Sequence, residues 1–558
     1  MVCRNTTRNL ACLSWAALAV ALVSGAPLAR AVDFKTGNPD FKIRWDNTVK
    51  YSAGLRLKDQ DDALVTAMPQ SLNQDDGDRN FDKGLMQNRF DLLSEFDVQY
   101  KGFGARASAA GWYDFVYNTG NDNTSPYTVN SFSKPAGEFT DATRDLAGRK
   151  IELLDAFVFL NVHAGDMSGS FKVGRHALQW GESLFFGANG VAGTMAPTDV
   201  TKLLGVPNAQ FKEIIMPVNQ ISAQWQFTPK FTIGAYYQLE WRRTRLPASG
   251  SYYSFIDILD EGGERLVTGE PHYPFQGPPS FFRSGDLEAK DGGQYGAQLR
   301  FRAGETDLGL YYNQYNAKDP QIYLAPQQVP NFQTGQIGTY NLNFAEGIKS
   351  LGASAAHTFG VWSTAAEVSY RWDMPLVSDA QTVLPIPGFL ADNDEHPLYA
   401  VGESFHAQAS WLASFGPMFL AKESNFLGEI AYNREMKVTK NEAAIDPNTT
   451  RDAWGFRIVY EPTYRQVFSG LDLSVPVGIG YNPKGASRVI GSFNGGADDG
   501  GDLNVGINGV YNGVYKFSLT FTTYLGSVGT YLDAANHFSF KQCLKDRDTL
   551  MLSVRTTF

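Results

Sequence analysis

The chain has 558 residues, and its 58 acidic side chains outnumber its 48 basic ones, so its formal net charge is −10. An acidic chain of this kind is a poor partner for nucleic acid. Its three cysteines, two of them within the first twelve residues, exclude a structural zinc site built on several thiolates, and we expect no cofactor.

The first 31 residues have the pattern of a secretory signal peptide. Arg4 and Arg8 precede an apolar run at 10–23, and the small-residue site Ala29-Arg30-Ala31 follows it. The run is too short to span a membrane as a helix. Cleavage after this site removes three basic residues and no acidic ones, which leaves 48 − 3 = 45 basic against 58 acidic side chains, a net charge of −13.

Beyond a short segment at 32–40, which we interpret as periplasmic, apolar and polar side chains alternate in one stretch after another. Short turns and long loops connect these stretches in strict alternation. The pattern predicts an all-β fold: 41–558 form a single transmembrane antiparallel β-barrel of about 18 strands (range 16–18), with long extracellular loops and both ends in the periplasm. The alternating segments are 41–57, 88–100, 104–117, 151–163, 170–177, 220–227, 231–242, 294–302, 307–314, 348–359, 362–373, 404–415, 425–433, 453–461, 471–481, 502–510, 514–525 and 549–558.

The first and last of these segments must pair if the barrel is to have no free edge. Segment 549–558 alternates regularly and stops on Phe558, an ending that resembles the C-terminal assembly signal of Gram-negative outer-membrane barrels. We therefore expect the barrel-assembly machinery, outer-membrane lipid and lipopolysaccharide as partners. A soluble sandwich is the alternative, but it does not explain nine long loops at one end.

Five blocks of the sequence are distinctive enough for comparison with known families. They are DDGDRNFDKG (75–84), WYD (112–114), GRHALQWGESLFF (174–186), FKEIIMPVNQ (211–220) and YYQLEW (236–241). Together they resemble a large family of proteobacterial outer-membrane proteins catalogued as a domain of unknown function, DUF1302. The resemblance implies a barrel that handles hydrophobic compounds such as hydrocarbons or sterols, often alongside export machinery, and it supplies no catalytic residues.

The segment 178–219 is too long for an ordinary connection, and it mixes aromatic, charged and glycine-rich stretches. We expect it to fold into the barrel and to narrow the channel. A loop that only fills empty lumen space is the alternative. The residues predicted to form the constriction and to hold its ends are Trp180, Glu182, Phe185, Phe186, Arg175 and Glu213.

Charged residues occupy the strand face opposite the apolar one, so they are expected to line the lumen. Because both signs occur, they indicate internal ion pairs more than a charge-selective pore, although they could simply solvate the interior. The predicted set is Lys42, Arg44, Asp46, Arg242, Arg300, Arg302, Glu367, Arg371 and Arg555.

Pro476 interrupts an otherwise regular strand. A closed barrel offers no free edge for a proline, so we expect a bulge at this position. Such a bulge would serve as a lateral opening through which apolar solutes leave for the bilayer, or it would be purely structural.

The outer loops carry two further kinds of candidate site. Asp75, Asp76 and Asp78 form an acidic turn that is a weak calcium candidate, because it lacks the spacing of a helix-flanked calcium loop. Apolar stretches at 251–259, 321–332 and 384–390 lie where water is expected. They indicate contact with a hydrophobic small-molecule ligand, or else packing of the loops on one another as a lid.

These observations favour an outer-membrane channel for binding and passive passage of hydrophobic small molecules, hydrocarbon- or sterol-like, gated by the inward-folded loop. A general porin for small polar solutes shares the fold and is one alternative. An outer-membrane hydrolase is the other. No GxSxG or HExxH spacing appears and the seven histidines are scattered, so we do not expect an enzyme.

Overall fold

The computed structural model describes residues 32–207 and 209–558, and the predicted signal peptide at 1–31 lies outside them. Among the described residues, no helix has the length and apolar character needed to cross a bilayer.

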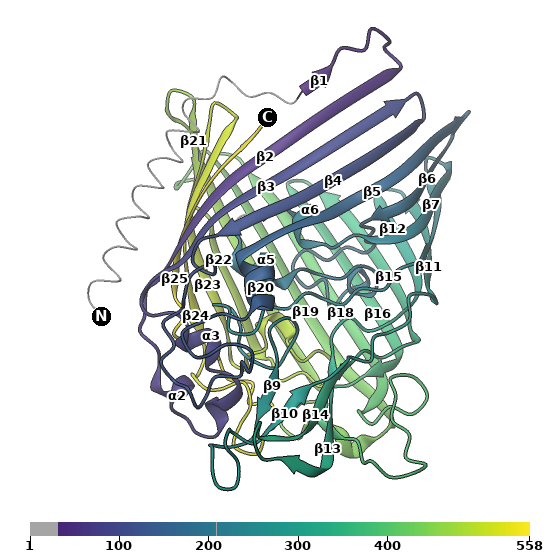
Figure 1. The fold of residues 1–558 in the computed structure, drawn as a ribbon. Helices are drawn as coiled ribbons and strands as arrows, with labels where there is room; N and C mark the ends of the chain where they lie inside the picture. Colours follow the sequence, from purple (N-terminus) through teal and green to yellow (C-terminus); the bar gives the residue numbers. More distant parts are fainter. Residues whose placement is uncertain (1–31, 208) are drawn as a thin grey trace.

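Within the described chain, eighteen antiparallel strands close into a barrel (Figure 1). Each strand is hydrogen-bonded to its neighbour on either side, and β21 and β22 together make one strand of the wall. In chain order the strands are β2 (Phe41–Arg56), β3 (Gly84–Tyr100), β4 (Phe103–Asp114), β5 (Arg149–Ala164), β6 (Met167–His176), β7 (Val218–Thr228), β8 (Phe231–Gln238), β11 (Gln294–Ala303), β12 (Thr306–Tyr315), β15 (Ile348–Phe359), β16 (Trp362–Pro375), β18 (Val401–Phe415), β19 (Glu423–Lys440), β20 (Asp452–Phe468), β21 (Leu471–Ser474), β22 (Val477–Lys484), β23 (Gly500–Tyr511), β24 (Tyr515–Leu525) and β25 (Thr549–Thr557).

The first and last strands meet, which confirms the predicted closure. Arg56 lies opposite Thr549 and Thr48 opposite Thr557. Beyond the ladder, Asn47 and Phe558 exchange two backbone hydrogen bonds, of 2.6 and 2.8 Å. A short strand, β1 (Val32–Phe34), folds back on β2 beside this seam. The barrel therefore has no free edge at its ends.

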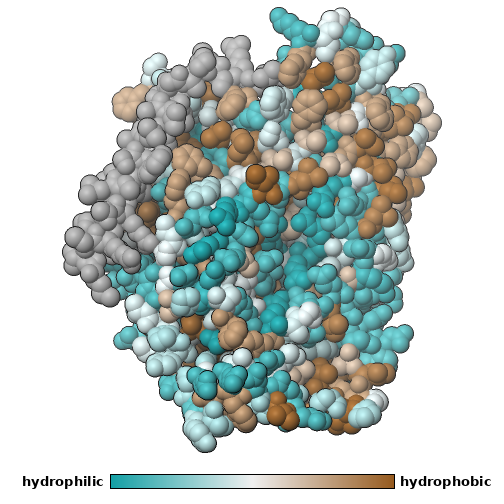
Figure 2. Space-filling model, viewed as in Figure 1, coloured by the Kyte–Doolittle hydropathy of each residue, from teal (hydrophilic) through white to brown (hydrophobic). Residues whose placement is uncertain are grey.

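The two faces of the wall differ as the alternation predicts. On β8, Phe231, Ile233 and Tyr237 are exposed on the outside, whereas Tyr236 and Gln238 are buried on the inside. Figure 2 shows apolar side chains gathered over the strand wall at the upper right of the molecule. An apolar outer belt around a closed barrel supports an outer-membrane location.

Tight turns join the strands at the periplasmic end of the barrel, where β2 begins and β25 ends. Asn512 and Gly513 link β23 to β24, and both have positive φ, 51° and 70°. Val514 completes the connection, and its N–H donates to the Tyr511 carbonyl over 3.1 Å, which closes a turn with Asn512 and Gly513 at its centre. Two central residues with positive φ match the twist of the flanking strands, and asparagine followed by glycine adopts this conformation at the lowest cost. The backbone conformation of Asn512 and Gly513 thus explains why this connection is short.

The long loops contain regular structure that alternation did not predict. Five short strands form a second sheet at the extracellular end, in the order β17–β13–β14–β10–β9. Their bounds are β9 (Arg265–Val267), β10 (Ser280–Arg283), β13 (Gln321–Asn331), β14 (Gln336–Asn343) and β17 (Gln381–Thr382). The short helices are α2 (Asp62–Val65), η1 (Gln70–Asn73), α3 (Asp76–Arg79), α4 (Asp141–Thr143), η2 (Arg144–Gly148), η3 (Val191–Thr194), α5 (Val200–Gly205), α6 (Phe211–Ile214), η4 (Glu442–Ala444) and η5 (Phe493–Gly495).

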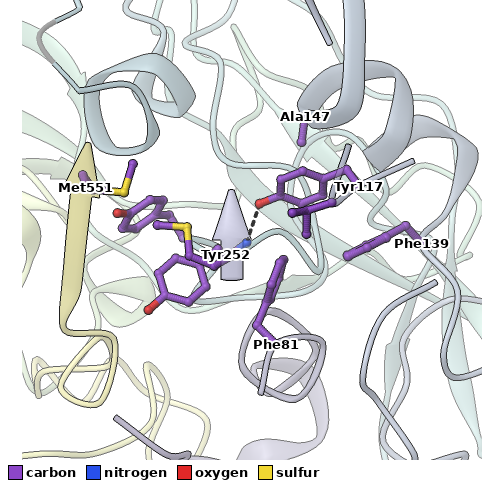
Figure 3. Packing of buried hydrophobic residues seen from close by; sticks show 9 residues of the cluster. Phe81, Tyr117, Phe139, Ala147, Tyr252 and Met551 are labelled. Carbon is purple, nitrogen blue, oxygen red and sulfur yellow. Dashed lines mark hydrogen bonds between the residues drawn. The ribbon is translucent and has the colours of Figure 1, made fainter. Parts of the chain in front are cut away.

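One apolar loop stretch packs inward over the mouth of the barrel. Tyr252 lies in a buried cluster with Phe81 and Tyr117, and its backbone N–H donates to the Tyr117 hydroxyl over 3.1 Å (Figure 3). Met551 joins this cluster from β25, so the loops are fixed to the wall. The stretch 251–259 therefore packs as a lid, whereas side chains of 384–390 such as Ile386 stay exposed.

The bulge predicted at Pro476 is wrong. Ser474 pairs with Thr463 and Val477 with Tyr460, so the register is the same on both sides of the proline. The Pro476 carbonyl accepts the N–H of Gly506 over 2.9 Å. A proline lacks one donor, so Pro476 and its diagonal neighbour across the ladder, Pro462, each remove one bond while the wall stays continuous. This continuity removes the basis for the lateral opening predicted at Pro476.

Candidate functional site

The connection between β6 and β7, residues 177–217, is called the inserted loop here, and it folds into the lumen. Figure 1 shows its two short helices, α5 and α6, inside the barrel. Its contacts reach β19, which is eight strand steps away from β6 around a barrel of eighteen. The inserted loop thus spans the lumen to the nearly opposite wall, which confirms the predicted inward-folded loop.

Glu429 on β19 fixes the far end of the inserted loop. Its carboxylate accepts backbone N–H groups from Leu184, Phe185 and Phe186 over 3.1, 2.5 and 2.9 Å. The glutamate is 0% exposed. A buried carboxylate costs much free energy unless donors surround it, and here the successive N–H groups of one turn supply them.

Glu367 on β16 holds the loop at a second point. Its two carboxylate oxygens accept the N–H groups of Glu182 and Val191 over 2.7 and 2.6 Å. Gly181 explains the close approach, because its φ is +99° and an added Cβ would lie 2.3 Å from a Glu367 oxygen. The glycine in the block GRHALQWGESLFF is therefore needed for this contact.

Arg371 and Asn189 complete the attachment. The Arg371 guanidinium, four residues from Glu367 on β16, donates to the carbonyls of Ala188, Asn189 and Gly190 over 2.9–3.1 Å. The Asn189 side chain lies between His406 and Asn433, with its Oδ1 3.2 and 3.3 Å from their side-chain nitrogens. Charged and amide groups of three wall strands thus bind one short stretch of loop backbone.

The second half of the inserted loop forms ion pairs with strands near its point of origin. The Lys202 ammonium of α5 lies 2.8 Å from Glu152 on β5, and Lys212 of α6 pairs with Glu95 on β3. Asp199 pairs with Arg245 over 2.6 Å. The loop is therefore fastened on both sides of the lumen and divides it.

The predicted constriction residues have different surroundings. Trp180 is buried and packs edge-on against Tyr236 with ring centroids 5.1 Å apart, and Phe186 is 5% exposed and packs against Phe493. Phe185 is 39% exposed and Glu182 is half-buried, 3.4 Å from Arg300. Of these four residues, Phe185 and Glu182 keep accessible surface, whereas Trp180 and Phe186 are buried.

Arg175 and Glu213 lie near the two ends of the inserted loop. Arg175 on β6 forms an ion pair of 2.8 Å with Glu240. Glu213 caps α6, because its carboxylate accepts the backbone N–H of Gln210 over 2.8 Å. The two residues stabilise separate parts of the chain and do not contact one another.

Several of the charges predicted to line the lumen touch the inserted loop. Arg300, Glu367 and Arg371 contact it as described, and Arg242 donates to the Pro217 carbonyl over 3.1 Å. Arg242 is on no strand, because β8 ends at Gln238 and the predicted segment 231–242 was too long. The others occur at the periplasmic end or along the seam: Arg44 pairs with Asp46 over 2.7 Å, Arg302 pairs with Asp307 over 2.7 Å, Arg555 lies opposite Lys50, and Lys42 lies opposite Gln99.

The exposed surface of the inserted loop is largely apolar. Leu184, Phe185, Leu203 and Phe211 are all exposed side chains of the loop. A more polar cavity of about 470 Å³ lies beside the loop, lined by side chains that include Lys150, Met216, Trp241, Arg242 and Asp260.

The acidic turn divides between two groups. Asp75 and Asp76 lie beside Asp257, whereas Asp78 pairs with the buried Arg56 over 2.5 Å. Burial raises the pKa of Asp75 to about 7 and that of Asp257 to about 6. Calcium binding by Asp75, Asp76 and Asp78 stays a prediction. Asp78 pairs with Arg56, whereas Asp75 and Asp76 lie beside Asp257.

Sequence reasoning did not identify Glu429, Asn189 or His406. An acidic residue in the middle of a lumen-facing strand is the signal that could have found Glu429, because such a residue needs a buried partner. Asn189 and His406 carry no comparable signal, since their roles depend on which strands the loop reaches.

Comparison with known proteins gives the following. A family model described as a protein of unknown function, DUF1302, matches residues 12–558. The chain is similar to solved structures of Acinetobacter baumannii OccAB4 (TM-score 0.42, 10% identity, covering 92% of this chain and 98% of that one) and of Pseudomonas aeruginosa OpdK with vanillate (0.39, 11%, 92% and 98%). It is also similar to Salmonella typhi OmpF in complex with daunomycin (0.36, 7%, 94% and 100%). No curated protein matches it. Because the family model covers essentially the whole chain, the protein belongs to the DUF1302 family.

Proposed function

We propose that the protein is an outer-membrane channel that binds hydrophobic small molecules, hydrocarbon- or sterol-like, and lets them pass passively along the inserted loop. One observation carries the proposal: a loop fastened to both walls of the lumen has four exposed apolar side chains, Leu184, Phe185, Leu203 and Phe211. Apolar surface inside a water-filled barrel is costly unless it contacts an apolar solute.

The attachment of the loop favours a fixed constriction over a moving gate. Its carbonyls and N–H groups are bound by Glu367, Arg371 and Glu429, and a movement would leave these buried charges without partners. Gating stays a prediction. Voltage-dependent closure that disappears on removal of the loop would support a gate.

The test replaces residues 178–217 by a short Gly–Ser turn and records ion conductance in planar bilayers. We expect conductance to rise several-fold, because the loop crosses the lumen. As a control, residues 384–390, an exposed outer stretch, are replaced by Gly–Ser of equal length. Unchanged conductance after loop removal would contradict a constriction.

Solute preference is tested with Phe185→Ser. Uptake of a lipophilic fluorescent probe into proteoliposomes should fall while ion conductance stays within the wild-type range. Phe419→Ser is the matched control, because Phe419 is 91% exposed at a periplasmic turn far from the loop. Equal probe uptake by the wild type and by Phe185→Ser would contradict a preference of the channel for hydrophobic solutes.

A general porin for small polar solutes is the second candidate function. The polar cavity beside the loop favours it, since Lys150, Arg242 and Asp260 line a space of about 470 Å³. Swelling of proteoliposomes in small sugars and amino acids, without probe uptake, would support this function.

A hydrolase remains the third class. Ser404 Oγ lies 2.9 Å from His406, which in turn lies 3.2 Å from Asn189, an order that a Ser–His–Asn site also shows. Ser404 and His406 are 0% and 1% exposed, so their burial favours a role in holding the loop. Turnover of an ester by purified protein, lost in Ser404→Ala, would support catalysis.

We further propose that Phe558 directs assembly by the barrel-assembly machinery and that the acidic loops contact lipopolysaccharide.

A further inference from the structure

Three extracellular loops bring two carboxylates and an imidazole together. Asp379 comes from the loop between β16 and β18, Asp446 from that between β19 and β20, and His537 from that between β24 and β25. One side-chain ligand atom from each residue lies within 4.8 Å of the other two. The residues are separated by up to 158 positions in sequence, so tertiary structure alone assembles this group.

The backbone around the group is well ordered by hydrogen bonds. Ser378 and Ile445 form an isolated β-bridge, in which Asp379 N donates to Ala444 O and Asp446 N donates to Val377 O, both over 3.1 Å. On the third loop, the backbone N–H of His537 donates to Asp533 over 3.0 Å. The three side chains are thus presented from fixed positions.

The geometry within the group suits a metal ion. His537 Nδ1 lies 2.9 Å from Asp379 Oδ1. On a tetrahedral ion with bonds of about 2.0–2.1 Å, two ligands are separated by about 3.3–3.4 Å, so a small outward movement of these two side chains would admit the ion. Each Asp446 oxygen accepts one backbone N–H, from Asn448 over 2.8 Å and from Phe538 over 2.7 Å, and retains a second lone pair.

The charge balance also leaves room for a cation. The charged groups that act most strongly on His537 are carboxylates, those of Asp379, Asp446 and Asp533. Asp446 itself is buried beside Asp379. Two neighbouring carboxylates with one imidazole carry excess negative charge, which a divalent ion would neutralise.

We propose that Asp379, Asp446 and His537 bind one divalent transition-metal ion that joins three extracellular loops. An imidazole nitrogen selects against magnesium and calcium, and mixed nitrogen and oxygen ligands suit ions such as Zn²⁺, with water completing the coordination. The proposal is independent of what passes through the barrel, since this site lies on the outer loops.

The test uses the full chain, purified in detergent, stripped with a chelator and titrated calorimetrically with ZnCl₂ in excess CaCl₂ to occupy weak acidic sites. We expect one Zn²⁺ per chain for the wild type and a loss of affinity of at least about tenfold for His537→Gln and for Asp379→Asn. His396→Gln is the matched control, because His396 pairs with Asp392 over 3.0 Å on the loop that also carries Asp379, and no third metal-binding side chain joins this pair among the described residues.

A second readout is limited proteolysis of residues 526–548. Zn²⁺ should slow cleavage in the wild type and in His396→Gln, and it should have no effect in His537→Gln. Retained heat-modifiability on gels shows that each variant is folded. The proposal is overturned if the wild type binds no Zn²⁺, or if His537→Gln binds it as tightly as the wild type, or if His396→Gln loses as much affinity as His537→Gln.

Discussion

Phe186 and Glu429 are joined across the lumen: the backbone N–H of Phe186 donates to the Glu429 carboxylate over 2.9 Å, although the two residues belong to nearly opposite sides of the barrel. The same oxygen accepts the N–H of Phe185. Glu429 therefore fixes residues 184–186 to the far wall, next to the stretch that Glu367 and Arg371 hold.

Glu429→Gln should loosen the inserted loop. In the wild type, three backbone N–H groups donate to one charged carboxylate oxygen. The glutamine amide keeps the size of the side chain but offers these donors only an uncharged oxygen, so we expect the free energy of unfolding to fall by about 1.5–3 kcal/mol. Single-channel recordings should show larger current fluctuations. Glu423→Gln is the control, because Glu423 begins the same strand and pairs with Arg465 while both are more than half exposed. Current fluctuations in Glu429→Gln that are as small as those of the wild type would contradict this role.

The barrel was predictable from the sequence because side-chain alternation is local, and a closed sheet in a membrane must separate polar from apolar faces along every strand. Closure was predictable for a similar reason, since Phe41–Arg56 and Thr549–Thr557 each have a neighbouring barrel strand along the chain on one side only. The second sheet was not, because β10 and β14 pair in parallel and span 4 and 8 residues, too short for a period to appear. Pro476 misled the prediction because a missing donor affects only one side of a strand.

The position of the inserted loop was predictable in part. Its length and mixed composition at 178–219 indicated insertion, and Glu367 and Arg371 were expected in the lumen. The roles of its individual residues were not predictable, because they depend on exposure. Trp180 and Phe186 are buried, whereas Phe185 is exposed. Such a difference arises from packing between segments far apart in the chain, which a local pattern does not contain.

Arg56→Met should destabilise the seam strongly. Arg56 is fully buried at the end of β2, 2.5 Å from Asp78 and 2.8 Å from Asp546. Removing the guanidinium leaves the buried carboxylates of Asp78 and Asp546 with one remaining cation among the described residues, Arg547, 3.8 Å from Asp78. We therefore expect a loss of about 3–5 kcal/mol in the free energy of unfolding. Urea unfolding in lipid vesicles measures it. Arg302→Met, which breaks an exposed ion pair with Asp307, should change stability by less than about 1 kcal/mol.

Leu519→Arg tests which face of the wall meets lipid. Leu519 lies in the middle of β24, exposed on the outside and opposite Ile507 and Leu552. A charge at this depth should cost about 2–4 kcal/mol, measured as reduced stability in vesicles. Phe468→Arg, at the periplasmic end of β20, should cost about 0–1 kcal/mol. Equal effects at the two positions would show that Leu519 does not face the hydrocarbon core.

Acidification should stabilise the loops over the mouth. Burial raises the pKa of Asp75 to about 7 and that of Asp257 to about 6, from an ordinary value of 3.8. Between about pH 4 and 7 the folded loops therefore bind more protons than the unfolded chain, and their stability falls as pH rises through this window. Hydrogen exchange of residues 58–83 and 244–262, corrected for the intrinsic rate, should show more protection at pH 5 than at pH 8. Asp257→Asn should reduce this difference, whereas Asp59→Asn, at a side chain that is mostly exposed, should leave it unchanged. Greater protection at pH 8 would mean that ionisation of these carboxylates supports the loops, through a partner that outweighs the cost of their burial.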